Sequence, residues 1–210
     1  MHSVKQAFKA APVTFILAAA NIIIFLGLSF IGMTEDGNFM AQHGAMYVPY
    51  VIAYKEYYRL ITCIFLHFGI GHLVNNMISL VLFGSALEKE IGSIKFAIIY
   101  FISGIGANIV SAIYDYSTQR YAVSAGASGA IFGAIGALLY VAIRNRGHIG
   151  NISSRGIVIM IAFTLYYGLT SQGVDNLAHV GGLVIGIILG ILLYWKKKNK
   201  YKNPYYDRWH

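Results

Sequence analysis

Long stretches without a charged side chain recur along the whole chain. They cover residues 10–34, 60–87, 96–114, 121–143, 156–174 and 176–195. A helix needs about 20 predominantly apolar residues to cross the hydrocarbon core of a bilayer. Lipid offers the backbone no hydrogen-bond partners, so each stretch is expected to be helical, and the sequence lacks the short alternating segments of a β-barrel. The pattern predicts six membrane-spanning helices, at roughly 11–33, 66–87, 96–114, 126–143, 156–172 and 177–195.

The composition supports this interpretation. Hydrophobic residues make up 57% of the chain and charged residues only 11%, whereas soluble domains carry about 25% charged residues. A secretory signal does not explain the excess, because the apolar stretches recur to the end of the sequence. We therefore expect an all-α membrane protein, a single membrane domain over residues 1–210 with a basic tail at 196–210.

The basic residues predict an orientation. The net charge of +8 could indicate nucleic-acid binding, but six of the sixteen basic residues follow Trp195. A basic run after an apolar helix is typical of an anchor at anionic lipid headgroups, so the expected partner is the bilayer and not nucleic acid. With the N-terminus inside, thirteen basic residues are cytoplasmic and three lie opposite. The positive-inside rule thus predicts that both termini are cytoplasmic.

A serine and a histidine stand near the start of two apolar stretches. Ser128 lies in the segment Gly-Ala-Ser-Gly at 126–129, and His179 lies three residues into the last stretch. Both stretches run inward in the predicted orientation, so the two side chains are expected at similar depth below the outer surface. A serine hydroxyl becomes a nucleophile when a base lies within about 2.6–3.2 Å, and an unpaired imidazole in lipid is costly. We predict that Ser128 is a nucleophile and His179 its general base.

Small residues on both stretches permit the close helix approach that this contact requires. Gly129 and Gly133 are four residues apart, and so are Gly182 and Gly186. His179 precedes the latter two by three and seven residues, so all three share one helix face. A G-x-x-x-G pattern often only packs helices together, but here a histidine projects from the packing face.

Donors for an oxyanion are expected on the second span. His72 and Asn76 are four residues apart and face the same way. Both can donate hydrogen bonds, and with the backbone N–H of Ser128 they would form an oxyanion hole. Asn75 points elsewhere and is expected to bond to a neighbouring helix.

Other hydrolytic chemistries do not fit the spacing. A metalloprotease helix needs two histidines one turn apart with a glutamate, but His67 and His72 are five apart with no adjoining acid. An aspartyl protease needs two buried aspartates, whereas Asp115 and Asp175 fall in the expected outer connections. Asp175 precedes the predicted base by four residues and is expected in a loop, at most as an accessory to a dyad.

Together these residues resemble the rhomboid family of intramembrane serine proteases over nearly the whole chain. The matching motifs are Gly126-Ala127-Ser128-Gly129 with Phe132 and Gly133, Ala178-His179-Val180-Gly181-Gly182 with Gly186, His72 to Asn76, and Ala86 to Ser93. The resemblance implies the six-helix bundle of a bacterial rhomboid core in the plasma membrane, with the active site open to the extracytoplasmic side. The glycines expected to support the site are Gly126, Gly129, Gly182 and Gly186.

The resemblance also implies roles for the polar residues. Ser128 and His179 would form the catalytic dyad, and His72 and Asn76 would complete the oxyanion hole. Phe132 would pack against the catalytic imidazole. The implied substrates are the transmembrane segments of other proteins, and no cofactor or metal is implied. The alternatives are an inactive relative that binds client helices as a scaffold, and a transporter or channel, which would place charged residues along several spans.

Overall fold

The computed structural model describes residues 2–171 and 173–195, and the predicted basic tail at 196–210 lies outside these residues. The long helices of the chain are α2 (Pro12–Ile31), α6 (Gly69–Ser79), α8 (Ser93–Thr118), α9 (Ser128–Arg144), α10 (Ser154–Thr170) and α11 (Asn176–Leu193). A π-helical turn, η2 (Leu80–Gly84), joins α6 to α7 (Ser85–Ile91) in one continuous rod. The shorter elements are α1 (His2–Ala10), α3 (Gly37–Gln42), α4 (Val48–Ala53), α5 (Arg59–Thr62), η1 (Cys63–Phe65), β1 (His148–Ile149) and β2 (Ile152–Ser153).

Each of the six predicted apolar segments contains one long helix. Four helices in the described part of the chain are long and apolar enough to cross a membrane: Pro12–Ile31, Gly69–Ile91, Ser93–Thr118 and Asn176–Leu193. The apolar helices α9 and α10 are shorter, with 17 residues each. The prediction of a helical protein is therefore confirmed, and four of the six segments are candidates to cross a membrane.

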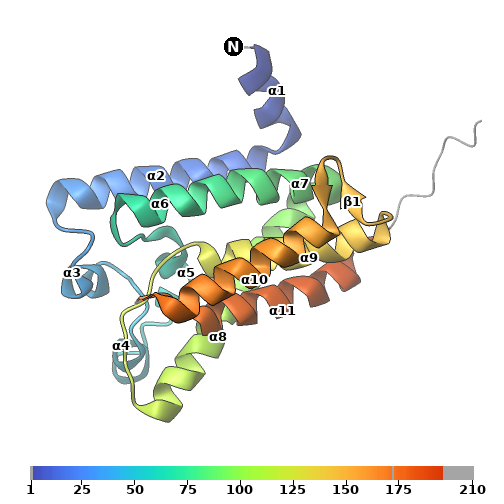
Figure 1. Cartoon of the computed structure of the whole chain (residues 1–210). Helices are drawn as coiled ribbons and strands as arrows, with labels where there is room; N and C mark the ends of the chain where they lie inside the picture. Colours follow the sequence, from blue (N-terminus) through green and yellow to red (C-terminus); the bar gives the residue numbers. More distant parts are fainter. Residues whose placement is uncertain (1, 172, 196–210) are drawn as a thin grey trace, which may run out of the picture.

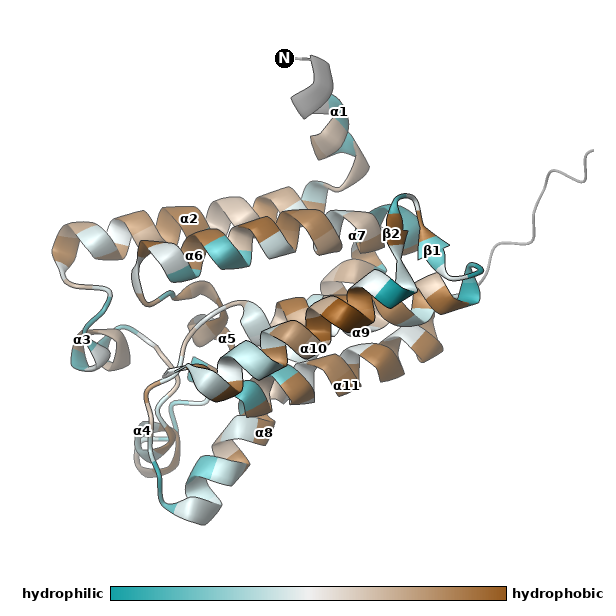
Figure 2. Cartoon of the chain, in the orientation of Figure 1, coloured by the Kyte–Doolittle hydropathy of each residue, from teal (hydrophilic) through white to brown (hydrophobic). Residues whose placement is uncertain are grey.

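Hydrophobic residues dominate α2 and α11, whereas α6 also carries hydrophilic turns (Figure 2). Phe30 on α2 is 88% exposed, and Phe163 and Leu169 on α10 are 71% and 78% exposed. Exposed apolar side chains over several neighbouring helices are typical of a surface that faces lipid.

Helix α9 lies at the centre of the fold, packed between α8 and α11 (Figure 1). Every residue from Gly129 to Leu138 is buried. Small residues dominate this segment, because both neighbouring backbones approach it closely. The central position of α9 places its first residue, Ser128, at one end of the bundle core.

The connection between α2 and α6 is folded, which the sequence pattern did not predict. It contains α3, α4, α5 and η1, and the buried guanidinium of Arg59 holds it together. The Arg59 Nη1 donates to the carbonyls of Ala41 at 2.6 Å and Ala45 at 2.7 Å, and Glu56 pairs with the same guanidinium.

One feature departs from the all-α prediction. A hairpin of two-residue strands, β1 and β2, connects α9 to α10, with His148 opposite Ser153 and Ile149 opposite Ile152. The two isoleucines pack against the helical core. Glycines with positive φ at 147 and 150 allow the tight reversal.

Candidate active site

The segment that leads into Ser128 is held by the folded connection between α2 and α6. Met46 and Ser124 exchange two backbone hydrogen bonds, of 2.8 and 2.9 Å. The N–H of Gly126 then donates to the carbonyl of Cys63 at 2.9 Å. The backbone just before Ser128 is therefore fixed by residues that lie 60 or more positions earlier in the chain.

His67 belongs to the same set of contacts, and the sequence analysis gave it no role. Its ring is 1% exposed, and its Nε2 accepts a 3.5 Å hydrogen bond from the N–H of Ala127. The ring also meets that of His72 edge to face, with centroids 5.1 Å apart. Like His179, His67 is an imidazole in an apolar segment and therefore needs a partner, which is the signal in the sequence that points to it.

Gly126 separates the His72 ring from the Ser128 hydroxyl. It has a φ of +140°, which L side chains rarely adopt. A Cβ at this position would lie 2.9 Å from His72 Nε2 and 3.8 Å from Ser128 Oγ. A side chain here would fill the space that the imidazole and the hydroxyl both line, so the position requires glycine for two reasons.

The orientation of His72 makes its free nitrogen a donor. Its Nδ1 accepts from the N–H of Phe68 at 3.4 Å. In a neutral imidazole, an accepting Nδ1 leaves the proton on Nε2. The N–H of His72 is therefore directed to the side of Gly126 and Ser128.

Ser128 is half-buried and begins α9. The first backbone bond of the helix runs from the N–H of Ile131 to the carbonyl of Ala127, at 2.9 Å. The N–H groups of the first turn, including that of Ser128, have no acceptor within the helix, and the helix dipole adds partial positive charge at this end. Such a helix start can stabilise a developing oxyanion.

His179 is buried on the first turns of α11 and stacks on Phe132 of α9. The ring centroids are 4.4 Å apart and the planes differ by 10°. Phe132 lies one turn after Ser128, so the imidazole is at the same end of α9 as the hydroxyl. Among the residues that the structure describes, no hydrogen bond joins the Ser128 hydroxyl to the His179 ring. Catalytic hydrogen bonds often tighten only when substrate binds.

Glycines bring the two helices into backbone contact. A Cβ at Gly182 would overlap the carbonyl of Gly129, and one at Gly186 would overlap the carbonyl of Gly133. The G-x-x-x-G face of α11 therefore packs directly on α9. This contact is what brings the His179 turn close to the start of α9.

Asn76 is buried one turn beyond His72 on α6, but its amide is turned toward its own helix. Its Nδ2 donates to the carbonyl of His72 at 2.9 Å. Within residues 2–171 and 173–195, no hydrogen bond connects Asn76 to Ser128 or His179. Asn75 is exposed, and in the same part of the chain it has no helix–helix hydrogen bond, contrary to the expectation from the sequence.

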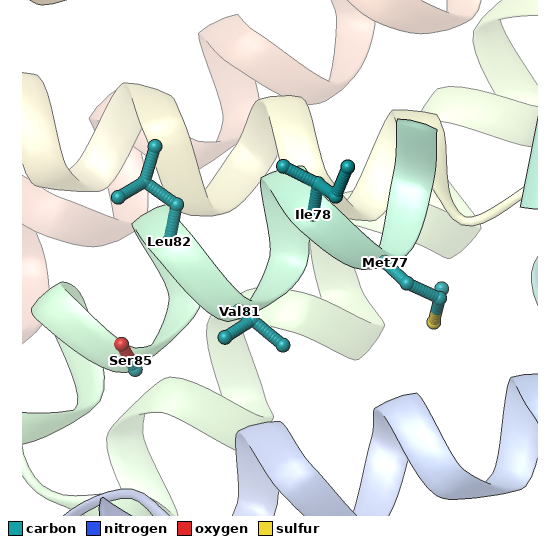
Figure 3. Close-up of a pocket in the computed structure, with 5 residues that line it drawn as sticks. All are labelled: Met77, Ile78, Val81, Leu82 and Ser85. Carbon is teal, nitrogen blue, oxygen red and sulfur yellow. The ribbon is translucent and has the colours of Figure 1, made fainter. Parts of the chain in front are cut away.

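An open apolar groove runs along the rod that carries His72 and Asn76. The residues that line it are Met77, Ile78, Val81, Leu82 and Ser85. Figure 3 shows Ile78 and Leu82 pointing to one side of the rod and Met77 and Val81 to the other. The groove has a single polar lining residue, Ser85, and so suits an apolar segment.

Comparisons of the sequence with known proteins place the chain in a family. Residues 54–196 match the model of the Rhomboid domain. The chain is 37% identical over 180 residues to "Rhomboid protease GluP" of Bacillus subtilis, covering 86% of this chain and 34% of that protein. It is 37% identical over 153 residues to "Putative rhomboid protease YdcA" of the same organism, covering 71% of this chain and 74% of that protein. "RHOMBOID-like protein 5" of Arabidopsis thaliana is 41% identical over 153 residues, covering 72% of this chain and 48% of the plant protein. The chain thus spans about a third to a half of the length of several relatives.

Proposed function

Because the chain belongs to the rhomboid family, we propose that it is an intramembrane serine endopeptidase with a Ser128–His179 dyad. The observation that carries the proposal is the stacking of His179 on Phe132, one turn from Ser128, across two helices in backbone contact. His179 is buried, and its Nδ1 has no hydrogen-bond partner in the described part of the chain, which is costly for a group with no further role. A general base next to a serine at a helix start explains it.

The proposed reaction follows the chemistry of an activated serine. His179 accepts the proton of Ser128 as the hydroxyl oxygen attacks the scissile carbonyl, and later donates it to the leaving amine. The N–H of His72 and the backbone N–H groups at the start of α9 stabilise the oxyanion. Asn76 contributes the second N–H of its amide, because the first is used by the carbonyl of His72. Water then hydrolyses the acyl-enzyme.

In the membrane, we propose six spans with both termini cytoplasmic and the site open to the extracytoplasmic side. Helix α9 has 17 residues and is about 25 Å long, shorter than the hydrocarbon core of about 30 Å. If Arg144, at the end of α9, reaches the inner membrane surface, Ser128 at its start would therefore lie below the outer membrane surface. Helix α8 has 26 residues and is about 39 Å long. Its C-terminal end, near Thr118, extends beyond the bundle (Figure 1).

The proposed substrates are transmembrane segments of other proteins. The apolar groove on α6, η2 and α7 fits a lipid-exposed helix, and it lies on the rod that carries His72. A helix must unwind locally before its carbonyl can be attacked, so segments with Gly or Pro near the scissile bond are the expected targets.

A scaffold that binds client helices without cleaving them is the second candidate. The names of the plant relatives, such as "RHOMBOID-like protein 1", do not describe them as proteases. This chain has both a serine and a histidine at the same end of two packed helices, which favours the protease.

The test is covalent labelling of the purified protein with a fluorophosphonate. Wild type should be labelled, Ser128→Ala should not be, and His179→Ala should be labelled at a strongly reduced rate. Ser117→Ala is the matched control, because this exposed hydroxyl bonds only to the Tyr114 carbonyl. Labelling of Ser128→Ala at the wild-type rate would refute the nucleophile, and a folded wild type without labelling or cleavage would favour the scaffold.

A further inference from the structure

Asp175 stands at the start of α11, and other groups occupy both of its carboxylate oxygens. Oδ1 accepts from the N–H of Ala178 at 2.9 Å, and Oδ2 accepts from the hydroxyl of Ser111 on α8. The backbone carbonyl of Asp175 accepts from the N–H of His179 at 3.2 Å. In the described part of the chain, no hydrogen bond joins this carboxylate to the imidazole of His179, whose Nδ1 has no partner there.

From these contacts we propose that Asp175 is a positioning residue and not the acid of a catalytic triad. With Ser111 it fixes the first turn of α11 on α8, and this sets the position of His179. The inference rests on the proposed function, since the position of His179 affects a rate only if His179 is the base.

The physical reason is that the start of a helix has N–H groups without acceptors. Here the Asp175 carboxylate accepts from one of them, the N–H of Ala178, and so caps the first turn of α11. The capping residue Asp175 also accepts a hydrogen bond from Ser111 of α8. The cap therefore holds the first turn of α11 against α8 as well as satisfying one of its N–H groups. A Cβ at Gly181 would lie 3.1 Å from Val110 Cβ, so α11 also packs closely on α8 two residues after His179.

Substitution of Asp175 by asparagine distinguishes a positioning residue from the acid of a catalytic triad. The amide oxygen of an asparagine can accept from the N–H of Ala178, and its NH₂ can donate to the Ser111 hydroxyl, which also accepts. Asparagine is as good an N-cap as aspartate. Positioning therefore survives in Asp175→Asn while the negative charge is lost. A triad acid would not tolerate this change, which costs about 10⁴-fold in kcat in a soluble serine protease.

The experiment measures kcat and KM for a single-span substrate in lipid, together with the pH profile of kcat/KM. Asp175→Asn should keep kcat within about threefold of wild type with an unchanged profile, because the cap is retained. Asp175→Ala should lose about tenfold or more in kcat with little change in KM, because a misplaced base slows the chemistry and not binding. Ser111→Ala should lose kcat in the same direction, and the double variant Asp175→Ala with Ser111→Ala should be no slower than Asp175→Ala alone.

Controls keep this inference distinct from the proposed function. Ser117→Ala removes a hydroxyl from the same helix without touching α11 and should behave as wild type. If wild type is neither labelled by a fluorophosphonate nor active, the proposed function fails. If wild type is labelled and Asp175→Asn is as slow as Asp175→Ala with a shifted pH profile, the positioning role fails and a triad acid replaces it. If Asp175→Ala does not fold, the test relies on Asp175→Asn and Ser111→Ala. Full activity of Ser111→Ala would also overturn the inference.

Discussion

Substituting Gly182 by alanine tests whether the contact between α9 and α11 sets the geometry of the candidate site. A Cβ at Gly182 would overlap the Gly129 carbonyl oxygen, and the carbonyl carbon of Gly129 would lie only 2.9 Å away. Carbon atoms in contact prefer about 3.5–4.0 Å, so the helices must separate by on the order of 1 Å at this level. Gly182 is three residues from His179 on the same face, so the imidazole moves with it.

The expected consequence is a loss of activity larger than the loss of stability. Overpacking of this kind costs about 1–3 kcal/mol in the free energy of unfolding, which leaves most of a folded population intact. A displacement of about 1 Å between a nucleophile and its base can cost about 10²-fold in rate. Gly182→Ala should therefore remain folded but lose about 10²-fold in kcat/KM.

Alanine substitutions at Gly190 and Gly27 serve as controls for Gly182→Ala. A Cβ at Gly190 would lie 3.0 Å from Ala137 Cα, a milder conflict two turns further from His179. A Cβ at Gly27 on α2 would meet nothing within 4 Å. Cleavage of a single-span substrate should fall most in Gly182→Ala, less in Gly190→Ala and not at all in Gly27→Ala. Wild-type cleavage by a folded Gly182→Ala would refute the idea that backbone contact between α9 and α11 positions the base.

Two further variants and one labelling experiment test other parts of the structure. Asn76→Ala should lower kcat by on the order of 10²-fold with unchanged thermal stability, and full activity would remove it from the oxyanion hole. Arg59→Met should lower the free energy of unfolding by about 2–5 kcal/mol in a thermal melt, because the carbonyls of Ala41 and Ala45 lose a buried charged donor; an unchanged melting temperature would contradict this. Burial raises the pKa of the Cys63 thiol to about 12, so the thiol stays protonated at pH 8. A maleimide should therefore react with Cys63 only after the protein unfolds. Rapid labelling of the folded protein would instead show that the thiol is accessible.

The helices could be predicted from the sequence because the signal is local. An uncharged run that faces lipid must be helical, so the runs located all six long helices. Their ends were less certain. The second run was expected to stop at residue 87, but the rod continues to Ile91 and buries Glu88. Glu88 accepts hydrogen bonds from the N–H groups of Val13 and Thr14 and from the Ser93 hydroxyl. Those partners belong to other helices, and no local pattern shows them.

In the candidate site, too, local signals could be predicted from the sequence and contacts between distant residues could not. Ser128 and His179 stood out because each is a polar residue in an apolar run, and the expected depth of each followed from the predicted orientation of its helix. His67 met the same criterion but was considered only as a metal ligand and set aside on spacing. The hydrogen bond from Ala127 to His67 and the bond from Gly126 to Cys63 depend on how the first connection folds over the start of α9. That fold rests on contacts between residues far apart in sequence.

The two proposed catalytic groups are positioned by different physical means. Ser128 is held through hydrogen bonds from the segment before it to Met46, Cys63 and His67, all in the connection between α2 and α6. His179 is held by the steric contact of glycines on α11 with α9 and by the cap at Asp175. Hydrogen bonds fix a backbone that turns sharply at Gly126, where no regular helix could do so. Close packing fixes a ring that, as the proposed general base, must move little during proton transfer. Changes in the first connection should therefore act on the serine, and changes along α11 on the histidine. Because a nucleophile and its base act as one unit, a variant that combines one change of each kind should lose less activity than the sum of the two separate losses.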